Sequence, residues 1–176
     1  MKTLFTITLI LLAGTSFSAK ATDLTTAEKE GIQLMLEEEK LAQDVYQFLN
    51  EKWELPIFNN ISQAETRHFN AIAFLIENFE FEDLAKEETG KFQNEDLQKL
   101  YDSLTEKGSE SLVAALEVGA FIEEVDIQDL QKLLALNTDS TIEGVYQNLL
   151  RGSNNHLRAF TGQLESRGEI YSPVFS

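Results

Sequence analysis

The scarcity of signals that interrupt helices or form strands is the strongest constraint on how this chain folds. Only two of its 176 residues are proline, Pro56 and Pro173, and proline is the residue that interrupts a helix most strongly. Runs in which valine, isoleucine or threonine alternate with polar residues, typical of strands, do not follow the N-terminal segment. We therefore predict an all-α fold.

Apolar residues recur every three or four positions along four long segments, which is the spacing of an amphipathic helix. The four predicted helices span residues 25–53, 62–79, 109–136 and 141–167. Between the second and the third, Asn94 is a favourable N-cap for a short helix that ends near Gly108. So long a connection predicts one crossover, with the second and third long helices running in the same direction.

The first 21 residues have the pattern of a segment for export. Lys2 is followed by an apolar run over residues 4–13 and by the small-residue triplet at residues 19–21, as in a secretory signal peptide. The apolar run is short for a membrane span, and no second such run follows. We therefore expect residues 1–21 to be removed, which leaves one periplasmic or secreted domain over residues 22–176 that does not enter the membrane.

The chain is strongly acidic, with a formal net charge of -16 at pH 7, and it contains no cysteine. Without cysteine no disulfide can form, so the stability of the mature domain must come from its core. The negative charge disfavours binding to nucleic acid and to anionic membrane surfaces, and it attracts cations. On charge alone, the simplest explanation is the solubility of an exported protein.

Acidic residues and histidines interrupt the apolar stripes of the long predicted helices. Glu65 and His68 are three residues apart, so they project from one face of the second helix. In the first helix Glu39 lies seven residues after Ile32, an apolar stripe position, and is expected to face inward. Its two acidic neighbours, residues 37–38, are expected to have more freedom to face water.

The third and fourth helices carry the matching polar positions. In the third helix Glu123 and Asp126 lie on the apolar stripe, whereas Glu124 is rotated by about 100° and is expected to point away. In the fourth helix the stripe contains His156, one of only two histidines in the chain. Each long helix therefore brings at least one acid or histidine to the predicted interior.

Carboxylates buried without partners would destabilise a domain strongly, and a shared pair of divalent metal ions removes that penalty. Glutamates and a Glu-x-x-His pair on facing helices form dinuclear metal sites in four-helix bundles. Oxygen-rich ligation with two imidazoles suits iron or manganese, and zinc is also acceptable. We predict that each chain binds two metal ions. Asp126 is expected to be either a ligand or a hydrogen-bond partner of a ligand. The predicted set is Glu39, Glu65, His68, Glu123, Asp126 and His156.

A different interpretation is open for single members of this set. Glu65 could instead cap the second helix, in a capping box with Ser62.

For Glu39 and Glu65 to meet, residues 54–60 are expected to run extended alongside the first helix. The alternative function is a metal-free helical interaction module whose inner polar residues form a hydrogen-bond network.

Four short motifs resemble the ferritin-like family known as domain of unknown function 2202. They lie at residues 37–46, 65–68, 122–127 and 152–160. The resemblance spans residues 28–175 and implies a ferritin-like four-helix bundle. In that superfamily the first helix carries glutamate and tyrosine seven residues apart, as Glu39 and Tyr46 are here, and the second carries Glu-x-x-His, as Glu65 and His68 do.

One departure from the superfamily pattern concerns the fourth helix, which usually repeats Glu-x-x-His. Here Ser153 lies three residues before His156, so one bridging carboxylate is missing, and Asp126 or Glu124 is the candidate replacement. The departure favours simple metal binding over dioxygen activation. If the centre is catalytic, we expect ferrous-ion oxidation or peroxide consumption at the metal pair. Metal ions are the expected partners, and a homodimer is left open.

Overall fold

The computed structural model of the protein describes residues 24–137 and 139–175. The export segment predicted at residues 1–21 lies outside the described residues. Within the described ranges all regular structure is helical, as predicted, and no strand occurs. The helices are α1, Thr26–Trp53; α2, Pro56–Asn78; α3, Glu95–Gly108; α4, Leu112–Leu136; and α5, Ser140–Glu165. None of these helices combines the length and the apolar character that a membrane span requires.

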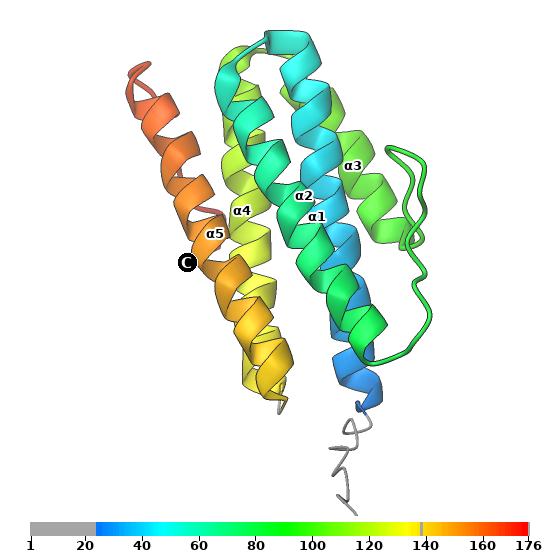
Figure 1. Cartoon of the computed structure of the whole chain (residues 1–176). Helices are drawn as coiled ribbons and strands as arrows, with labels where there is room; N and C mark the ends of the chain where they lie inside the picture. Colours follow the sequence, from blue (N-terminus) through cyan, green and yellow to red (C-terminus); the bar gives the residue numbers. More distant parts are fainter. Residues whose placement is uncertain (1–23, 138, 176) are drawn as a thin grey trace, which may run out of the picture.

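The four long helices form two antiparallel pairs, and the short helix α3 lies outside them (Figure 1). α1 packs mainly on α2, and α4 packs mainly on α5; smaller contacts join α1 to α4 and α2 to α5. The chain between α2 and α4 runs the length of the molecule and includes α3 (Figure 1). α2 and α4 therefore run in the same direction, as the long connection predicts.

The junction between α1 and α2 differs from the prediction. Residues 54–60 are not extended, because α2 begins at Pro56, and proline at the first position of a helix has a suitable φ and loses no hydrogen bond. Glu54 adopts a left-handed conformation, with φ 50°, and this residue ends α1 and lets the chain reverse. Ser62 and Glu65 consequently lie inside α2, so the capping box considered for them does not form.

The caps of the later helices agree more closely with the sequence. Asn94 caps α3 as predicted, because its side-chain oxygen accepts the backbone N–H of Asp96. α4 starts later than predicted, since Ser111 rather than Ser109 is its N-cap and accepts the N–H of Ala114. Short polar side chains at these positions satisfy N–H groups that have no partner within the helix.

One polar face of α1 holds the crossover in place. The carboxylate of Glu37 accepts the backbone N–H of Asn94 at 2.9 Å, and the carboxylate of Asp44 accepts that of Gly90 at 2.8 Å. The prediction that Glu37 faces water is therefore wrong, because the crossover covers it. Glu38 is also buried, with an exposed fraction of 4%.

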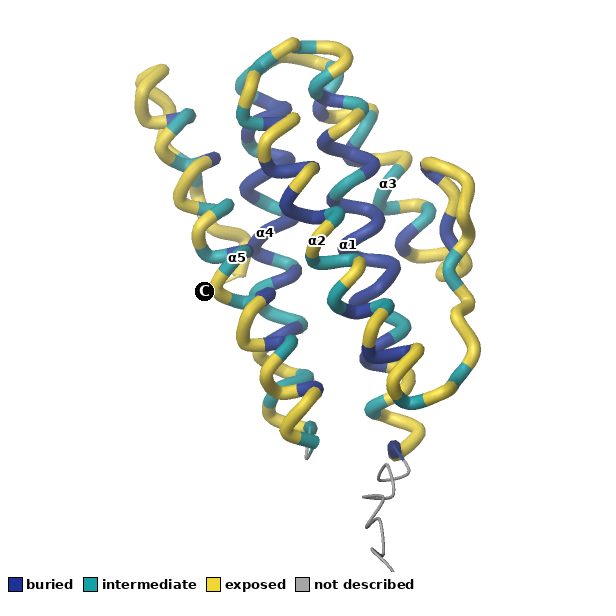
Figure 2. Tube along the Cα trace, viewed as in Figure 1, coloured by how far each residue is buried: buried dark blue, intermediate teal, exposed yellow. Residues whose placement is uncertain are grey.

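A polar layer divides the core into two apolar clusters. The cluster nearer the α1–α2 junction contains Leu41, Phe58 and Phe160, and the other contains Ile32 and Ile72. Along each long helix, the predicted site residues lie between members of these two clusters. Figure 2 shows that the middle of α1 is buried and its ends are exposed, whereas α5 keeps an exposed outer face. The polar layer therefore lies where the four helices face one another.

Candidate metal centre

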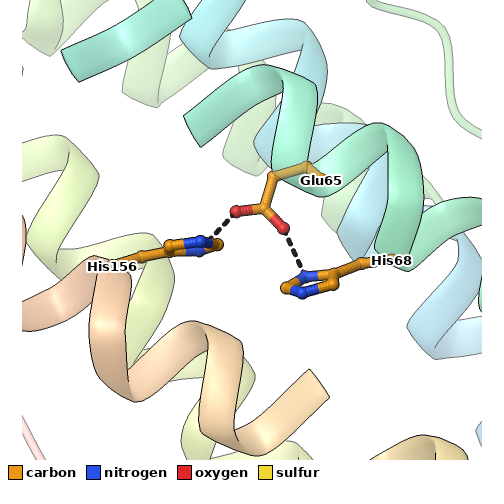
Figure 3. A group of neighbouring side chains, drawn as sticks. All are labelled: Glu65, His68 and His156. Atoms are coloured by element: carbon orange, nitrogen blue, oxygen red, sulfur yellow. Dashed lines mark ion pairs between the residues drawn. The ribbon is translucent and has the colours of Figure 1, made fainter. Parts of the chain in front are cut away.

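Glu65 lies between the two histidines and contacts both (Figure 3). Its Oε2 lies 2.6 Å from Nδ1 of His68, and its Oε1 lies 2.7 Å from Nδ1 of His156. The outer acids flank this arrangement: Nδ1 of His68 is 3.3 Å from Oε2 of Glu39, and Nδ1 of His156 is 3.5 Å from Oε1 of Glu123. We call these five residues the central cluster, to which α1, α2, α4 and α5 all contribute.

The central cluster has two matching halves that share Glu65. One half adds Glu39 and His68, and the other adds Glu123 and His156. The two imidazole rings stack with their centroids 5.5 Å apart and their planes at 29°. Each half contains one imidazole nitrogen and oxygens from two carboxylates, and Glu65 gives one oxygen to each half.

Many polar atoms of the central cluster are buried without a hydrogen bond. They include both oxygens of Glu39, Oε1 of Glu65, Oε2 of Glu123 and the Nδ1 atoms of His68 and His156. The short distances around Nδ1 are contacts between an imidazole and a carboxylate. Buried polar atoms without partners are costly and need an explanation. One ligand atom from each of Glu65, His68 and His156 lies within 4.8 Å of the others, so this donor set fits a metal ion.

The pKa of Glu65 is shifted in the opposite direction from the pKa values of the outer acids, Glu39 and Glu123. Burial, opposed by contact with His68 and reinforced by the charge of Glu65, raises the pKa of Glu39 to about 8. Burial and the charge of Glu65 raise the pKa of Glu123 to about 7. Burial also acts to raise the pKa of Glu65, but contacts with His156 and His68 outweigh it and lower that pKa to about 2.

The pKa values of the two histidines are raised by the carboxylates around them. Burial acts to lower their pKa values, but the adjacent carboxylates outweigh it and raise the pKa of His68 and of His156 to about 10. Without metal at neutral pH, both imidazoles therefore carry a proton between ionised Glu65 and the outer acids. Since metal ligation needs neutral imidazole and ionised carboxylate, a metal ion must displace these protons.

Tyr46 supports one of the outer acids. It is fully buried, and its hydroxyl donates a hydrogen bond to Oε1 of Glu123 at 2.7 Å and lies 3.3 Å from the carbonyl oxygen of Gly119. A hydrogen bond of this kind fixes the orientation of a ligating carboxylate. The contact crosses from α1 to α4, so sequence spacing within α1 does not reveal it.

Asp126 lies beside the central cluster rather than within it. The histidine contacts described above come from Glu39, Glu65 and Glu123, and Oδ2 of Asp126 is buried without a hydrogen bond. Burial and the charges of Glu39 and Glu123 raise the pKa of Asp126 well above its usual range. Asp126 therefore lies close enough to Glu39 and Glu123 for their charges to raise its pKa. Its oxygen without a hydrogen bond suits a role as a partner outside the set of ligands.

Neither Ser153 nor Glu124 supplies the carboxylate that the superfamily pattern has three residues before the histidine of the fourth helix. Ser153 is buried, and its hydroxyl donates to the carbonyl oxygen of Leu149 at 3.2 Å. Glu124 points away from the central cluster, as predicted, and holds the C-terminal tail: it accepts the Tyr171 hydroxyl at 2.7 Å and the Val174 N–H at 2.9 Å. Of the two candidate replacements, Asp126 is the one on the correct side of α4.

The family assignment follows from comparison with known proteins. The family described as "Uncharacterized protein domain (DUF2202)" matches residues 28–176. This chain belongs to the DUF2202 family. The uncharacterized protein MJ0754 of Methanocaldococcus jannaschii is 44% identical over 153 residues, which cover 86% of this chain and 83% of that protein.

A solved structure supports the same relationship. The crystal structure of hypothetical protein MJ0754 from Methanococcus jannaschii DSM 2661 matches this DUF2202 chain with a TM-score of 0.87 and 42% sequence identity. The match covers 90% of this chain and 91% of that one. The family predicted from the four motifs is thus confirmed, and the helical fold matches that of a solved relative.

Gly152 is a site residue that sequence reasoning left without a role. A Cβ atom at this position on α5 would lie 2.5 Å from both Cε1 and Nε2 of His68. Real Cβ atoms do not approach other atoms so closely, so the ring would have to move. The absence of a side chain at Gly152 lets α5 pack against the His68 imidazole and keeps Nδ1 directed at Glu65.

We expect Gly152→Ala to displace His68 and to weaken metal binding in its half of the central cluster. Overpacking of this kind typically lowers the free energy of unfolding by about 1–3 kcal/mol. Urea unfolding and metal titration measure the two effects. Gly144→Ala is the matched control on α5, because nothing lies within 4 Å of its added Cβ. Unchanged metal affinity in Gly152→Ala would contradict the positioning role.

Proposed function

We propose that this DUF2202 protein is a ferritin-like four-helix bundle that binds two divalent metal ions, iron, manganese or zinc, in the central cluster. The observation that carries the proposal is the position of Glu65, with one oxygen directed at each histidine. Its support is the set of buried cluster atoms that have no hydrogen-bond partner. Two antiparallel helix pairs joined by one long crossover are consistent with the ferritin-like topology.

Each metal ion would have three protein ligands. Glu39, Glu65 and His68 would hold one ion, and Glu65, Glu123 and His156 would hold the other. Two divalent ions carry four positive charges, and the three ligand carboxylates carry three negative charges. Ionised Asp126 beside them would neutralise the fourth, which supports its assignment as an outer partner.

A bound pair of iron or manganese ions would supply redox chemistry, such as ferrous-ion oxidation or peroxide consumption. Ser153 stands where the superfamily pattern has a second bridging carboxylate, so Glu65 would be the one protein bridge between the two ions. The side chains of His68 and His156 are 15% and 14% exposed, so the two imidazoles are not sealed from solvent. The buried carboxylates of Glu39, Glu65 and Glu123 would supply the negative charge of the site and orient the bound ions.

We also propose that the protein functions outside the cytoplasm, in the periplasm or as a secreted protein. The support is the signal-peptide pattern over residues 1–21. N-terminal sequencing of the protein from fractionated cells tests this proposal. Cleavage after Ala21 supports export, and an intact N-terminus on cytoplasmic protein contradicts it.

Metal analysis tests the proposed function. Protein purified without chelator is expected to contain two equivalents of metal per chain, and the Glu65→Ala/His68→Ala variant is expected to contain none. Anaerobic loading with ferrous iron, followed by dioxygen or peroxide, then tests whether the site turns over. Wild-type protein that is fully folded and takes up no metal would support the metal-free interaction module instead.

A further inference from the structure

The acidic residues of this chain are distributed unevenly over its helices. Residues 55–76, which include most of α2, contain one acid, Glu65, and it is buried; residues 144–164, which include most of α5, contain none. All the other acids of the chain, whose formal net charge is -16, lie outside these two stretches. The two stretches therefore present an outer surface without acidic side chains on an otherwise strongly acidic protein.

Three of the chain's four arginines lie in these two stretches. They are Arg67 on α2 and Arg151 and Arg158 on α5, and all three are exposed. Arg67 donates a hydrogen bond from Nη1 to the backbone carbonyl oxygen of Gln63 at 2.9 Å. Among the described residues, none of the three arginines forms an ion pair with an acid. We call the exposed surface of α2 and α5 that carries these three residues the arginine face.

The two arginines of α5 are held by a short sequence unit that occurs twice. Asn148 and Arg151 form the first Asn-x-x-Arg unit, and Asn155 and Arg158 form the second, seven residues later. In each unit the side-chain oxygen of the asparagine accepts a hydrogen bond from Nη2 of the arginine. Residues seven apart lie on nearly the same side of a helix. The two guanidinium groups are therefore held in a row along the exposed side of α5.

The arginine face lies beside the two histidines of the central cluster. Arg67 follows directly before His68 in α2, and Arg158 lies two residues after His156 in α5. Both imidazoles lie between α2 and α5 (Figure 3) and are partly exposed, by 15% and 14%. A molecule bound to the arginine face would therefore lie next to the part of the central cluster that reaches solvent.

The spacing of the arginines favours an extended anionic partner over a small anion. Arg151 and Arg158 are about 10.5 Å apart along the helix axis, which is more than one phosphate or carboxylate group spans. Each guanidinium keeps donors after its one hydrogen bond to asparagine, and arginine binds a carboxylate through two parallel hydrogen bonds. The arginine face can therefore bind several carboxylates at once.

The charge of the rest of the chain decides between the extended anions. Nucleic acid and anionic membranes carry negative charge over large areas, so they would also meet the acidic remainder of this protein and be repelled. A folded protein can confine its acids to an area that matches the arginine face. Charges more than about 8 Å apart are largely screened at physiological ionic strength, so the net negative charge does not prevent such a local contact.

We propose that the arginine face docks an acidic surface of a partner protein, whose carboxylates pair with Arg67, Arg151 and Arg158. The acids elsewhere on the chain repel the same partner, which restricts its orientation to the histidine side of the central cluster. The inference goes beyond metal binding and does not depend on it, because it rests on the charges and hydrogen bonds of α2 and α5.

A synthetic peptide of about ten glutamates is the probe, and NMR shifts of the backbone amides of the metal-free full chain are the readout. The peptide should shift amides of the arginine face. Arg151→Glu/Arg158→Glu should weaken its binding by about tenfold or more, because each reversal removes an exposed ion pair and adds a repulsion of similar size. Lys99→Glu/Lys107→Glu is the matched control, since it changes the net charge equally at two exposed lysines of α3, and it should bind the peptide nearly as tightly as the wild type.

Circular dichroism and thermal unfolding check that both variants are folded. Weakening in the arginine variant alone supports the docking surface. The proposal is overturned if the wild type does not bind the peptide, or if the two variants lose affinity equally. It is also overturned if inorganic phosphate, duplex DNA or phosphatidylglycerol vesicles shift the same amides at lower concentration than the peptide, because the arginine face would then serve a small anion, a nucleic acid or a membrane.

Discussion

Replacement of Glu65 by alanine should abolish tight binding of both metal ions. Glu65 is the only member of the central cluster that contacts both histidines, so its loss removes a ligand from each half. Loss of an outer partner alone typically weakens metal binding by about 10- to 100-fold, and loss of a shared ligand should exceed that range. His68→Ala should have a smaller effect, because it removes a ligand from one half only.

Competition between the protein and a chelator of known affinity measures this prediction with Zn²⁺ or Mn²⁺. Glu77→Ala is a matched control, because Glu77 is an exposed glutamate on α2, the same helix as Glu65. The wild type and Glu77→Ala should bind two ions, His68→Ala one, and Glu65→Ala none tightly. Binding of two ions by Glu65→Ala with wild-type affinity would rule out a bridging role.

The second large effect is an opposite response of the metal-free and metal-loaded proteins to pH. Protonated His68 and His156, with pKa values raised from 6.5 to about 10, stabilise the metal-free fold fully below pH 6.5, and this stability is lost as the pH rises toward 10. Glu39 and Glu123, with pKa values raised from 4.5 to about 8 and about 7, lose protons over the lower part of this range and add repulsion. Glu65, with a pKa lowered to about 2, stays ionised throughout.

Metal binding reverses the trend, because each proton that the metal displaces makes binding tighter at higher pH. The melting temperature of the metal-free protein should therefore fall between pH 6 and pH 8.5, while the increase caused by added metal should grow over the same range. At pH 5 the metal should have little effect. Thermal unfolding with and without chelator measures both quantities. A metal-induced increase that is the same at pH 5 and pH 8 would contradict the ligand assignment.

Helical periodicity was sufficient to predict much of the site. Because side chains three, four and seven residues apart share a helical face, the positions of Glu39 and His156 within apolar stripes predicted their inward direction. The same spacing separated Glu123 from Glu124, and the structure directs Glu124 to the C-terminal tail instead. These predictions succeeded because they depend on one helix at a time.

The predictions were wrong where a distant part of the chain determines the surroundings of a residue. Glu37 and Glu38 look like a solvated face of α1, but the crossover and α3 cover them. The role of Gly152 depends on the approach of α5 to α2, and spacing within α5 does not contain that information. Pro56 was interpreted as part of an extended segment, although proline is equally suited to the first turn of a helix.

Anomalous X-ray diffraction from metal-soaked crystals tests the central claim most directly. Data collected at the absorption edge of manganese or zinc should show two peaks per chain in the polar layer, one beside each oxygen of Glu65. Paired metal ions that share a site of this kind lie about 3.5–4 Å apart. A single peak, or peaks only at surface carboxylates with none between His68 and His156, would contradict the dinuclear centre.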